Sequence, residues 1–321
     1  MLSPKLEERK LWLRNLPSRT ALKICNQRHV RTWLGSRYER MIGDHRASLP
    51  ELTGIDEDIA HALEMRGVYV TSLDRLSLDG GEALLDTAEH LAEDFTREAH
   101  ALAQAGQSFI IVPPERIAAN PAIWLFGLQD RLLDIAETYL GVPVAYDGVA
   151  INYTVADGRE ISTRKWHRDW EDRRMLKIAV YLHDVDEHGG PFEHICRLDT
   201  LQSDREGFRY NLADNAELEA RLGSGFAQDI VSCTGLRGTV IFNDTARFFH
   251  RGKPATGRDR AALFYSYFAN PPRHPFLCER TGLSRKHIAR MARDLPDRQR
   301  GAALWRNRVS PALRLIPPAT L

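Results

Sequence analysis

At the centre of the chain the sequence reads Lys165-Trp166-His167-Arg168-Asp169-Trp170. On a β-strand, residues two apart point to the same face, so the imidazole of His167 and the carboxylate of Asp169 converge while Arg168 points away. These two side chains supply half of a metal site. Two histidines and one carboxylate on one face of an iron ion leave positions open for a co-substrate and dioxygen. A second histidine is therefore expected from a distant strand.

That second histidine is expected to be His250. It closes the segment 238–252, which reads as a strand, a short connection and then a histidine beside a glycine. Ten residues further on, Arg260 opens the apolar run 261–268. The planar guanidinium of an arginine can bind a carboxylate through two parallel hydrogen bonds, which a lysine cannot match. A metal triad and a carboxylate clamp together indicate a site for a 2-oxo diacid.

With these residues the chain resembles the phytanoyl-CoA dioxygenase-like family of Fe(II)/2-oxoglutarate-dependent oxygenases. The resemblance covers about residues 105–275 and rests on Trp166-His167-Arg168-Asp169, on the run Leu176 to Asp186 with Gly190-Pro191-Phe192 after it, and on His250 with Arg260. It implies an α+β protein whose core is a double-stranded β-helix, a cupin-like jelly roll of two sheets with the iron at one open end.

Carried over residue by residue, the resemblance implies that His167, Asp169 and His250 are the iron ligands. It implies that Arg260 binds the distal carboxylate of 2-oxoglutarate and that Tyr181 borders this co-substrate. No catalytic residue is expected beyond the metal centre. The implied reaction uses Fe(II), 2-oxoglutarate and O2, oxidises an unactivated C–H bond and releases succinate and CO2. Hydroxylation is the expected outcome, although related enzymes also desaturate, close rings or dealkylate.

The chain departs from the family pattern after Gly190-Pro191. The family continues into a Pro-Gly-Ser-His turn beside the substrate entrance, whereas residues 192–199 read Phe-Glu-His-Ile-Cys-Arg-Leu-Asp. The ligand set is intact, but the identity of the substrate does not transfer. We expect a small-molecule metabolite or natural-product intermediate, with an acyl-CoA ester as the alternative.

Two predicted strands carry further candidates for binding the co-substrate. In the run 149–155, Asn152 shares a face with Ala150 and Thr154, and if this face lines the barrel, Asn152 can contact co-substrate or substrate. The alternative is an edge-strand asparagine bonded to backbone. In the run 177–182, Lys177 shares a face with Tyr181, which fits a wall that receives an anion. The alternative is a lysine that reaches solvent.

The loop after the metal strand supplies candidates for binding the substrate. It contains Trp170, Arg173 and Arg174, an aromatic and two cationic side chains directly after the ligands. They could position an anionic substrate. Paired charges on an exposed loop would explain the same residues without a function.

The sequence divides into three parts: a helical N-terminal layer over residues 1–105, an oxygenase core over 106–275 with an insertion at about 200–237, and a helical C-terminal extension over 276–321. One helix is predicted over 121–140, with Pro121 in its first turn and Gly141 past its end. Residues 1–46 are basic and 51–104 acidic. We expect the basic N-terminal and C-terminal segments to pair with this acidic layer, rather than with phosphate backbones.

The composition of the whole chain limits the classes of protein to which it can belong. The 321 residues carry a net charge of +1, which gives no overall attraction to nucleic acid or membrane. The four cysteines show no CxxC spacing, and no run of eighteen apolar residues occurs. We expect a cytoplasmic protein that acts on a small molecule.

Two alternatives to an oxygenase remain at this stage. One is a non-catalytic, metal-binding cupin-like sensor or structural protein, which would have no need of a clamp such as Arg260. The other is a demethylase that acts on nucleic acid, for which the basic terminal segments would be the electrostatic footprint. The net charge of +1 argues against the latter.

Overall fold

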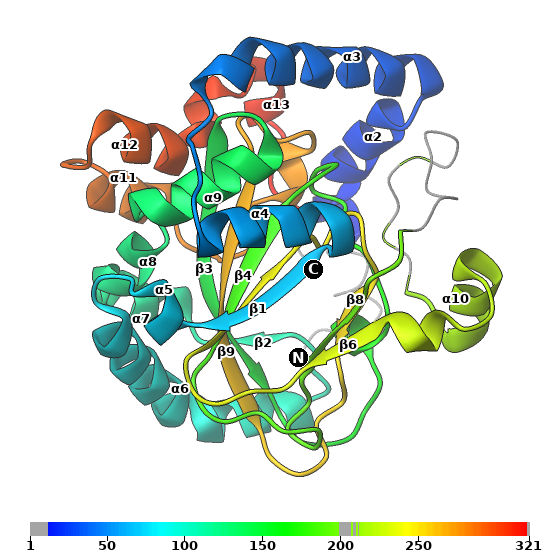
Figure 1. Cartoon of the computed structure of the whole chain (residues 1–321), viewed down its shortest axis with the longest axis vertical. Helices are drawn as coiled ribbons and strands as arrows, with labels where there is room; N and C mark the ends of the chain where they lie inside the picture. The colour runs from blue at the N-terminus through cyan, green and yellow to red at the C-terminus, as the bar shows by residue number, and fades with distance from the viewer. Residues whose placement is uncertain (1–11, 199–206, 208–209, 211, 320–321) are drawn as a thin grey trace.

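The computed structural model describes residues 12–198, 207, 210 and 212–319, and two antiparallel sheets lie at its centre (Figure 1). The larger sheet has the order β1 (Val68–Ser72), β7 (Thr239–Asn243), β4 (Leu176–Tyr181), β9 (Arg260–Ala269), β3 (Val144–Thr154) and β2 (Ile110–Ile111). The smaller sheet has the order β6 (Ile230–Cys233), β5 (Phe192–Ile195) and β8 (His250–Gly252).

One face of the larger sheet packs against helices, and its other face packs against the smaller sheet. On β4, Ile178 and Val180 belong to the main core, which they share with helical residues such as Ile59. Ala179 and Tyr181, between and beyond them, pack in a second cluster with residues of the smaller sheet. The alternation predicted for this strand is confirmed, because successive side chains point to opposite faces.

The smaller sheet brings distant parts of the chain together. Strand β5 pairs with both β6 and β8, and an isolated bridge joins His167 to His250. Residues 200–237 were predicted as an insertion within the core, and much of 199–211 lies outside the described residues. Strand β6 lies in the last part of this segment and pairs with β5 along its whole length.

Helices surround the sheets, and Figure 1 shows α6 to α9 on the opposite side from β6, β8 and α10. The N-terminal helices are α2 (Leu16–Cys25), α3 (Arg28–His45), α4 (Ile55–Arg66), α5 (Leu73–Leu76) and α6 (Gly81–Gln104). They are followed by α7 (Pro114–Ala119), α8 (Pro121–Phe126), α9 (Asp130–Leu140) and α10 (Asn215–Leu222). The N-terminal third is not purely helical as predicted, because β1 pairs with β7 at the edge of the larger sheet.

The C-terminal extension forms α11 (Arg285–Met291), α12 (Asp297–Ala303) and α13 (Pro311–Arg314). Its charges were predicted to pair with the acidic segment 51–104, but Arg298 forms ion pairs with Asp134 and Glu137 of α9 at 2.6 and 2.7 Å. Helix α9 lies nearer because α12 packs against β3. Within the described residues, none of the helices combines the length and the apolar character that crossing a lipid bilayer requires.

The single helix predicted over 121–140 is two helices, α8 and α9, with a break at Gly127. The carbonyl of Gly127 accepts a hydrogen bond of 2.7 Å from the hydroxyl of Tyr267. A Cβ at this position would lie 2.6 Å from the hydroxyl oxygen of Tyr146 and 2.6 Å from a ring carbon of Tyr265. The chain breaks here because the buried tyrosines of the sheet approach its backbone directly.

Gly127→Ala is therefore expected to destabilise the protein by about 1–3 kcal/mol, the usual cost of overpacking. Gly301→Ala is the matched control, because a Cβ there meets nothing within 4 Å and the residue lies inside α12. It should be neutral or stabilise by up to about 1 kcal/mol. Urea unfolding of both variants measures the difference, and equal stabilities would show that the tyrosines do not set the helix break.

Candidate metal centre

Three side chains converge beside strand β8 of the smaller sheet. One ligand atom each from His167, Asp169 and His250 can be chosen so that all lie within 4.8 Å of one another. The antiparallel bridge between the two histidines holds their backbones together, with hydrogen bonds of 3.0 Å in both directions. All three residues are buried. The arrangement matches the predicted triad and could hold one metal ion.

The two histidines are set up as neutral ligands. Nδ1 of His167 lies 2.8 Å from the carbonyl of Lys165, and Nδ1 of His250 lies 3.3 Å from the carbonyl of Phe248. A protonated Nδ1 that donates to these carbonyls leaves Nε2 with a free lone pair. Burial lowers the pKa of His167 and, more strongly, that of His250, so both rings are uncharged at neutral pH.

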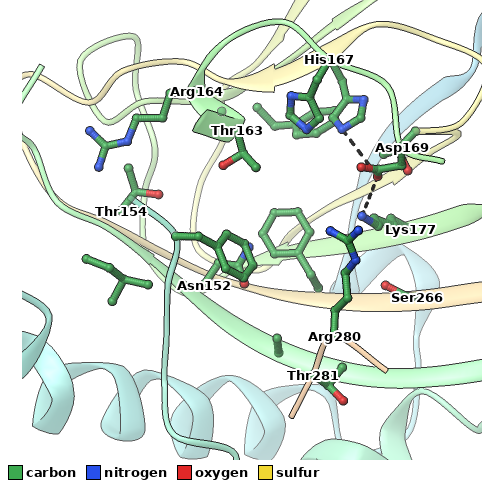
Figure 2. A pocket seen from close by; sticks show the side chains of 18 of the residues that line it. Asn152, Thr154, Thr163, Arg164, His167, Asp169, Lys177, Ser266, Arg280 and Thr281 are labelled. Carbon is green, nitrogen blue, oxygen red and sulfur yellow. Dashed lines mark hydrogen bonds and ion pairs between the residues drawn. The ribbon is translucent and has the colours of Figure 1, made fainter. Parts of the chain in front are cut away.

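Asp169 supplies the negative charge of the site. Burial opposes its ionisation, but the charge and the hydrogen bond of Lys177 outweigh burial and hold the pKa of Asp169 well below its usual range. Nζ of Lys177 lies 2.6 Å from Oδ2 of Asp169 (Figure 2). Lys177 lines the cavity, as predicted for the face that it shares with Tyr181. Its charge is directed at the metal ligand rather than at solvent.

The triad opens into a cavity of about 1120 Å³, open mouth included, between the two sheets. Strands β3, β4 and β9 of the larger sheet and β5 and β8 of the smaller sheet all contribute to its lining. Figure 2 shows Thr154 and Arg164 on one side of it and Asp169, Lys177 and Arg280 on the other. Its size suits two small molecules or one larger one.

Arg260 lines the same cavity, and its guanidinium is buried without an acidic partner among the described residues. One terminal nitrogen donates to the carbonyl of Gly190, and the other donates to Oγ1 of Thr154 at 3.1 Å. Burial lowers its pKa, yet an arginine stays protonated at neutral pH. A buried cation that lacks an anion is costly, so this one is expected to bind an anion from outside the chain.

Gly252 makes room for this guanidinium. A Cβ at Gly252 would lie 2.9 Å from Nη2 of Arg260. Gly252 is two residues after His250 on β8, and two residues of a strand span roughly 7 Å. The guanidinium therefore lies beside the strand that carries His250, a member of the triad.

Tyr181 was expected to border the co-substrate, but it does not line the cavity. Its hydroxyl donates to the carbonyl of Cys233 at 2.7 Å and accepts from the amide of Phe192 at 2.9 Å. A further hydrogen bond joins it to Arg260. Burial raises the pKa of Tyr181 to about 12, which Arg260 partly offsets. Tyr181 thus holds the guanidinium of Arg260 from outside the cavity.

Asn152 lines the cavity together with Ala150 and Thr154, the face predicted to look inward. Its Oδ1 is buried and has no hydrogen-bond partner among the described residues. Buried amide oxygens are normally satisfied, so this one is available to a donor on a bound molecule. The alternative, an edge-strand asparagine bonded to backbone through this oxygen, is not what the structure shows.

The three substrate candidates in the loop after Asp169 lie outside the cavity lining. Arg173 stacks over the ring of Tyr38 at 5.2 Å, and Arg174 pairs with Glu64 at 2.7 Å. Trp170 is half-buried behind Tyr210, with 5.5 Å between ring centres. The physical reason is that this loop turns towards the helices, which satisfy its cations, so direct substrate contact by these residues is not supported.

Several polar residues of the lining were not singled out from the sequence: Asp147, Thr163, Arg164, Glu171, Thr245, Ser266, Arg280 and Thr281. Ser266 could have been found, because it shares the predicted inward face of β9 with Arg260. Arg280 belongs to the basic C-terminal segment, which was expected to pair with the acidic segment 51–104. It reaches the cavity through tertiary contacts that leave no periodic signal in the sequence.

No protein-family model and no curated protein matches the chain. Among solved structures, it is similar to EctD from S. alaskensis, with 24% identity, a TM-score of 0.45 and coverage of 70% of this chain and 81% of that one. Similar too are the epimerase SnoN in complex with Fe3+, alpha ketoglutarate and nogalamycin RO (15% identity, TM-score 0.44, coverage 76% and 91%) and HygX from Streptomyces hygroscopicus with nickel and 2-oxoglutarate bound (17%, 0.40, 68% and 90%).

These matches include proteins that hold a metal ion and 2-oxoglutarate. Because the identities lie below 25% and the TM-scores below 0.5, what this chain does has to be judged from its own residues.

Proposed function

We propose that the protein is an Fe(II)- and 2-oxoglutarate-dependent oxygenase that oxidises, most simply hydroxylates, a C–H bond of a small molecule. The observation that carries the proposal is the pairing of two features in one cavity. One is the buried triad of His167, Asp169 and His250, and the other is the buried guanidinium of Arg260, which lacks an acidic partner among the described residues. The two sheets that enclose this cavity support the jelly-roll architecture that such a function implies.

The residues present fit a ferrous ion. Two neutral imidazoles and one carboxylate are the donor set of non-haem Fe(II) oxygenases, and they occupy one face of a metal. The carbonyls of Lys165 and Phe248 fix the histidine rings, as outer hydrogen bonds do in metal proteins. When bound, the ion supplies the redox chemistry that activates dioxygen, which amino-acid side chains cannot supply.

The chain itself binds and orients the co-substrate. Arg260 offers two donors to a carboxylate, and Tyr181 and Gly190 fix the plane of its guanidinium. Gly252 keeps the space beside the guanidinium open. Asn152 offers an unsatisfied amide oxygen in the same cavity. The donors of Arg260 and the space beside them favour a diacid with one end at the metal and the other at Arg260, whereas the oxygen of Asn152 suits a donor on the substrate, because a 2-oxoglutarate dianion carries acceptors alone.

A metal-binding cupin-like sensor or structural protein is the competing proposal. Such a protein has no use for a buried cation beside its metal, because an unpaired guanidinium in the interior lowers stability. The position of Arg260 in the metal cavity therefore favours turnover over simple binding.

A turnover assay tests the proposal without knowledge of the substrate. Purified protein with Fe(II), 2-oxoglutarate and oxygen is expected to release succinate slowly, and His250→Ala is expected to release none above the protein-free background. Succinate is measured by chromatography. Release at the wild-type rate from His250→Ala would contradict the proposal, as would the absence of succinate from wild-type protein that binds both Fe(II) and 2-oxoglutarate.

A further inference from the structure

We infer that Arg280 anchors the carboxylate of the oxidised substrate, and that this substrate is a small monocarboxylic acid with an apolar body. The inference rests on the proposed function and deepens it by naming the class of substrate. Two observations support it. Contacts from Asp147 and Glu171 fix Arg280 in place, and the two terminal nitrogens of its guanidinium have no acceptor among the described residues.

The backbone around Arg280 is held by a buried carboxylate. Asp147 of β3 accepts two hydrogen bonds from the amide of Glu279, at 3.0 and 2.8 Å, and its carbonyl accepts one from Oγ1 of Thr281 at 3.5 Å. The side chain of Glu279 is held in turn by Arg285 and Arg306, at 3.0 and 3.1 Å. The segment thus belongs to the rigid wall of the cavity, although it lies outside both sheets.

The side chain of Arg280 is anchored through its Nε alone. Nε lies 3.0 Å from Oε1 of Glu171 and donates to the carbonyl of Leu277 at 3.0 Å. Glu171 is buried and follows the metal ligand Asp169 by two residues, so the anchor ties Arg280 to the metal centre. Neither terminal nitrogen of Arg280 has an acceptor in the part of the chain that the structure describes. Figure 2 shows the guanidinium turned into the cavity towards Asp169 and Lys177.

A guanidinium held in this way presents two parallel donors, the geometry that binds a carboxylate. The other cations of the cavity use terminal nitrogens in contacts within the chain, whereas Arg280 pairs with Glu171 through Nε. Arg164 pairs with Asp157, Lys177 pairs with Asp169, and Arg260 lies beside Thr154 on the opposite side. Arg280 is therefore the cation best placed to receive a second anion near the metal.

The donors that Arg280 leaves free favour a substrate with one carboxylate. Its two terminal nitrogens match the two oxygens of a single carboxylate group. Arg164 and Lys177 already pair with Asp157 and Asp169 within the chain.

The apolar residues of the lining favour a substrate with an apolar body. Phe109, Ile110, Phe264 and Phe268 line the cavity together with Arg280. Aromatic side chains gain most by covering apolar surface. An acid whose carboxylate lies at Arg280 would place its body against these rings, within reach of the metal ligands.

Calorimetric titration with matched acids and amides tests the inference. Anaerobic protein that has been saturated with Fe(II) and 2-oxoglutarate is titrated with cyclohexanecarboxylate and cyclohexanecarboxamide, and with benzoate and benzamide. Wild-type protein is expected to bind each acid at least about tenfold more tightly than its amide, since hydrogen bonds to charged groups exceed those to neutral ones. Arg280→Gln should abolish this preference, and Arg280→Lys should keep only part of it.

Arg290→Gln is the matched control, because Arg290 is an exposed arginine of the same C-terminal segment, and it should keep the full preference. Equal binding of acid and amide by wild-type protein, no binding of either acid, or a preference that survives Arg280→Gln would overturn the inference. The saturation step separates this result from the proposed function. If 2-oxoglutarate fails to bind, the co-substrate is wrong, and the preference for the acids is then measured on the metal-loaded protein alone.

Discussion

Asp169→Ala is expected to abolish metal binding and, with it, all turnover of 2-oxoglutarate. The substitution removes the only anionic donor of the triad and leaves two neutral histidines beside the ammonium of Lys177, which repels a cation. Loss of an outer-shell partner already costs about 10–100-fold in metal affinity, so loss of a direct ligand should cost more than about 100-fold. Anaerobic calorimetry with Fe(II) measures the change.

The control for this variant is Asp244→Asn. Asp244 is a buried carboxylate that bonds Tyr139 and Arg247 and has no place in the cavity lining. It tests whether removal of any buried negative charge lowers the metal affinity. Wild-type affinity in Asp169→Ala, or an equal loss in both variants, would show that the triad is not the metal site.

Arg260→Ala is expected to leave Fe(II) bound while raising the dissociation constant of 2-oxoglutarate. Two charged hydrogen bonds to a carboxylate would be lost, which amounts to about 2–4 kcal/mol. Arg260→Lys should recover only part of this, because an ammonium cannot form the parallel pair. Titration of the Fe(II)-loaded protein with 2-oxoglutarate measures both values.

Gly252→Ala tests the same contact from the other side. The added methyl group would lie 2.9 Å from Nη2 of Arg260 and should displace the guanidinium without removing its charge. We expect weaker binding of 2-oxoglutarate with unchanged Fe(II) affinity.

Unchanged binding of 2-oxoglutarate in Arg260→Ala would assign the carboxylate clamp to another cation. Arg164 is then the next candidate, because it lines the cavity, whereas Arg258 is exposed and pairs with Asp186.

The parts of the site that follow from local spacing could be predicted from the sequence. His167 and Asp169 stand two residues apart, and Lys177 lies on the inward face that strand alternation assigns to it. His250 was expected after a strand and a short connection, and Arg260 was expected at the opening of the next apolar run. All five residues line one cavity.

The parts that depend on tertiary contacts could not be predicted. Arg280 reaches the cavity because Asp147, far away in the sequence, binds the backbone beside it. The loop with Arg173 turns away from the cavity because the carboxylate of Asp172 accepts a hydrogen bond from the amide of Ala269 at 3.1 Å. Neither contact leaves a repeating pattern in the sequence.

In the fold, too, the elements with a local sequence pattern could be predicted, and those that depend on tertiary contacts could not. The alternating strands of the core were expected, and so was a helical C-terminal extension, which contains α11. Strand β1 was missed, although its Val-Tyr-Val-Thr run has the composition of a strand, because the N-terminal third was interpreted as helical throughout. The break at Gly127 was missed because the tyrosines that cause it come from β3 and β9.

The most direct test of the account is an anaerobic titration with Fe(II) and 2-oxoglutarate, followed by visible spectroscopy. A 2-oxo acid that chelates Fe(II) gives a weak charge-transfer band in the visible range. The account predicts that this band appears in wild-type protein, is absent from Asp169→Ala, and requires far more 2-oxoglutarate in Arg260→Ala. Wild-type protein that binds Fe(II) but never develops the band with 2-oxoglutarate would contradict the account and identify the chain as a metal-binding protein of another kind.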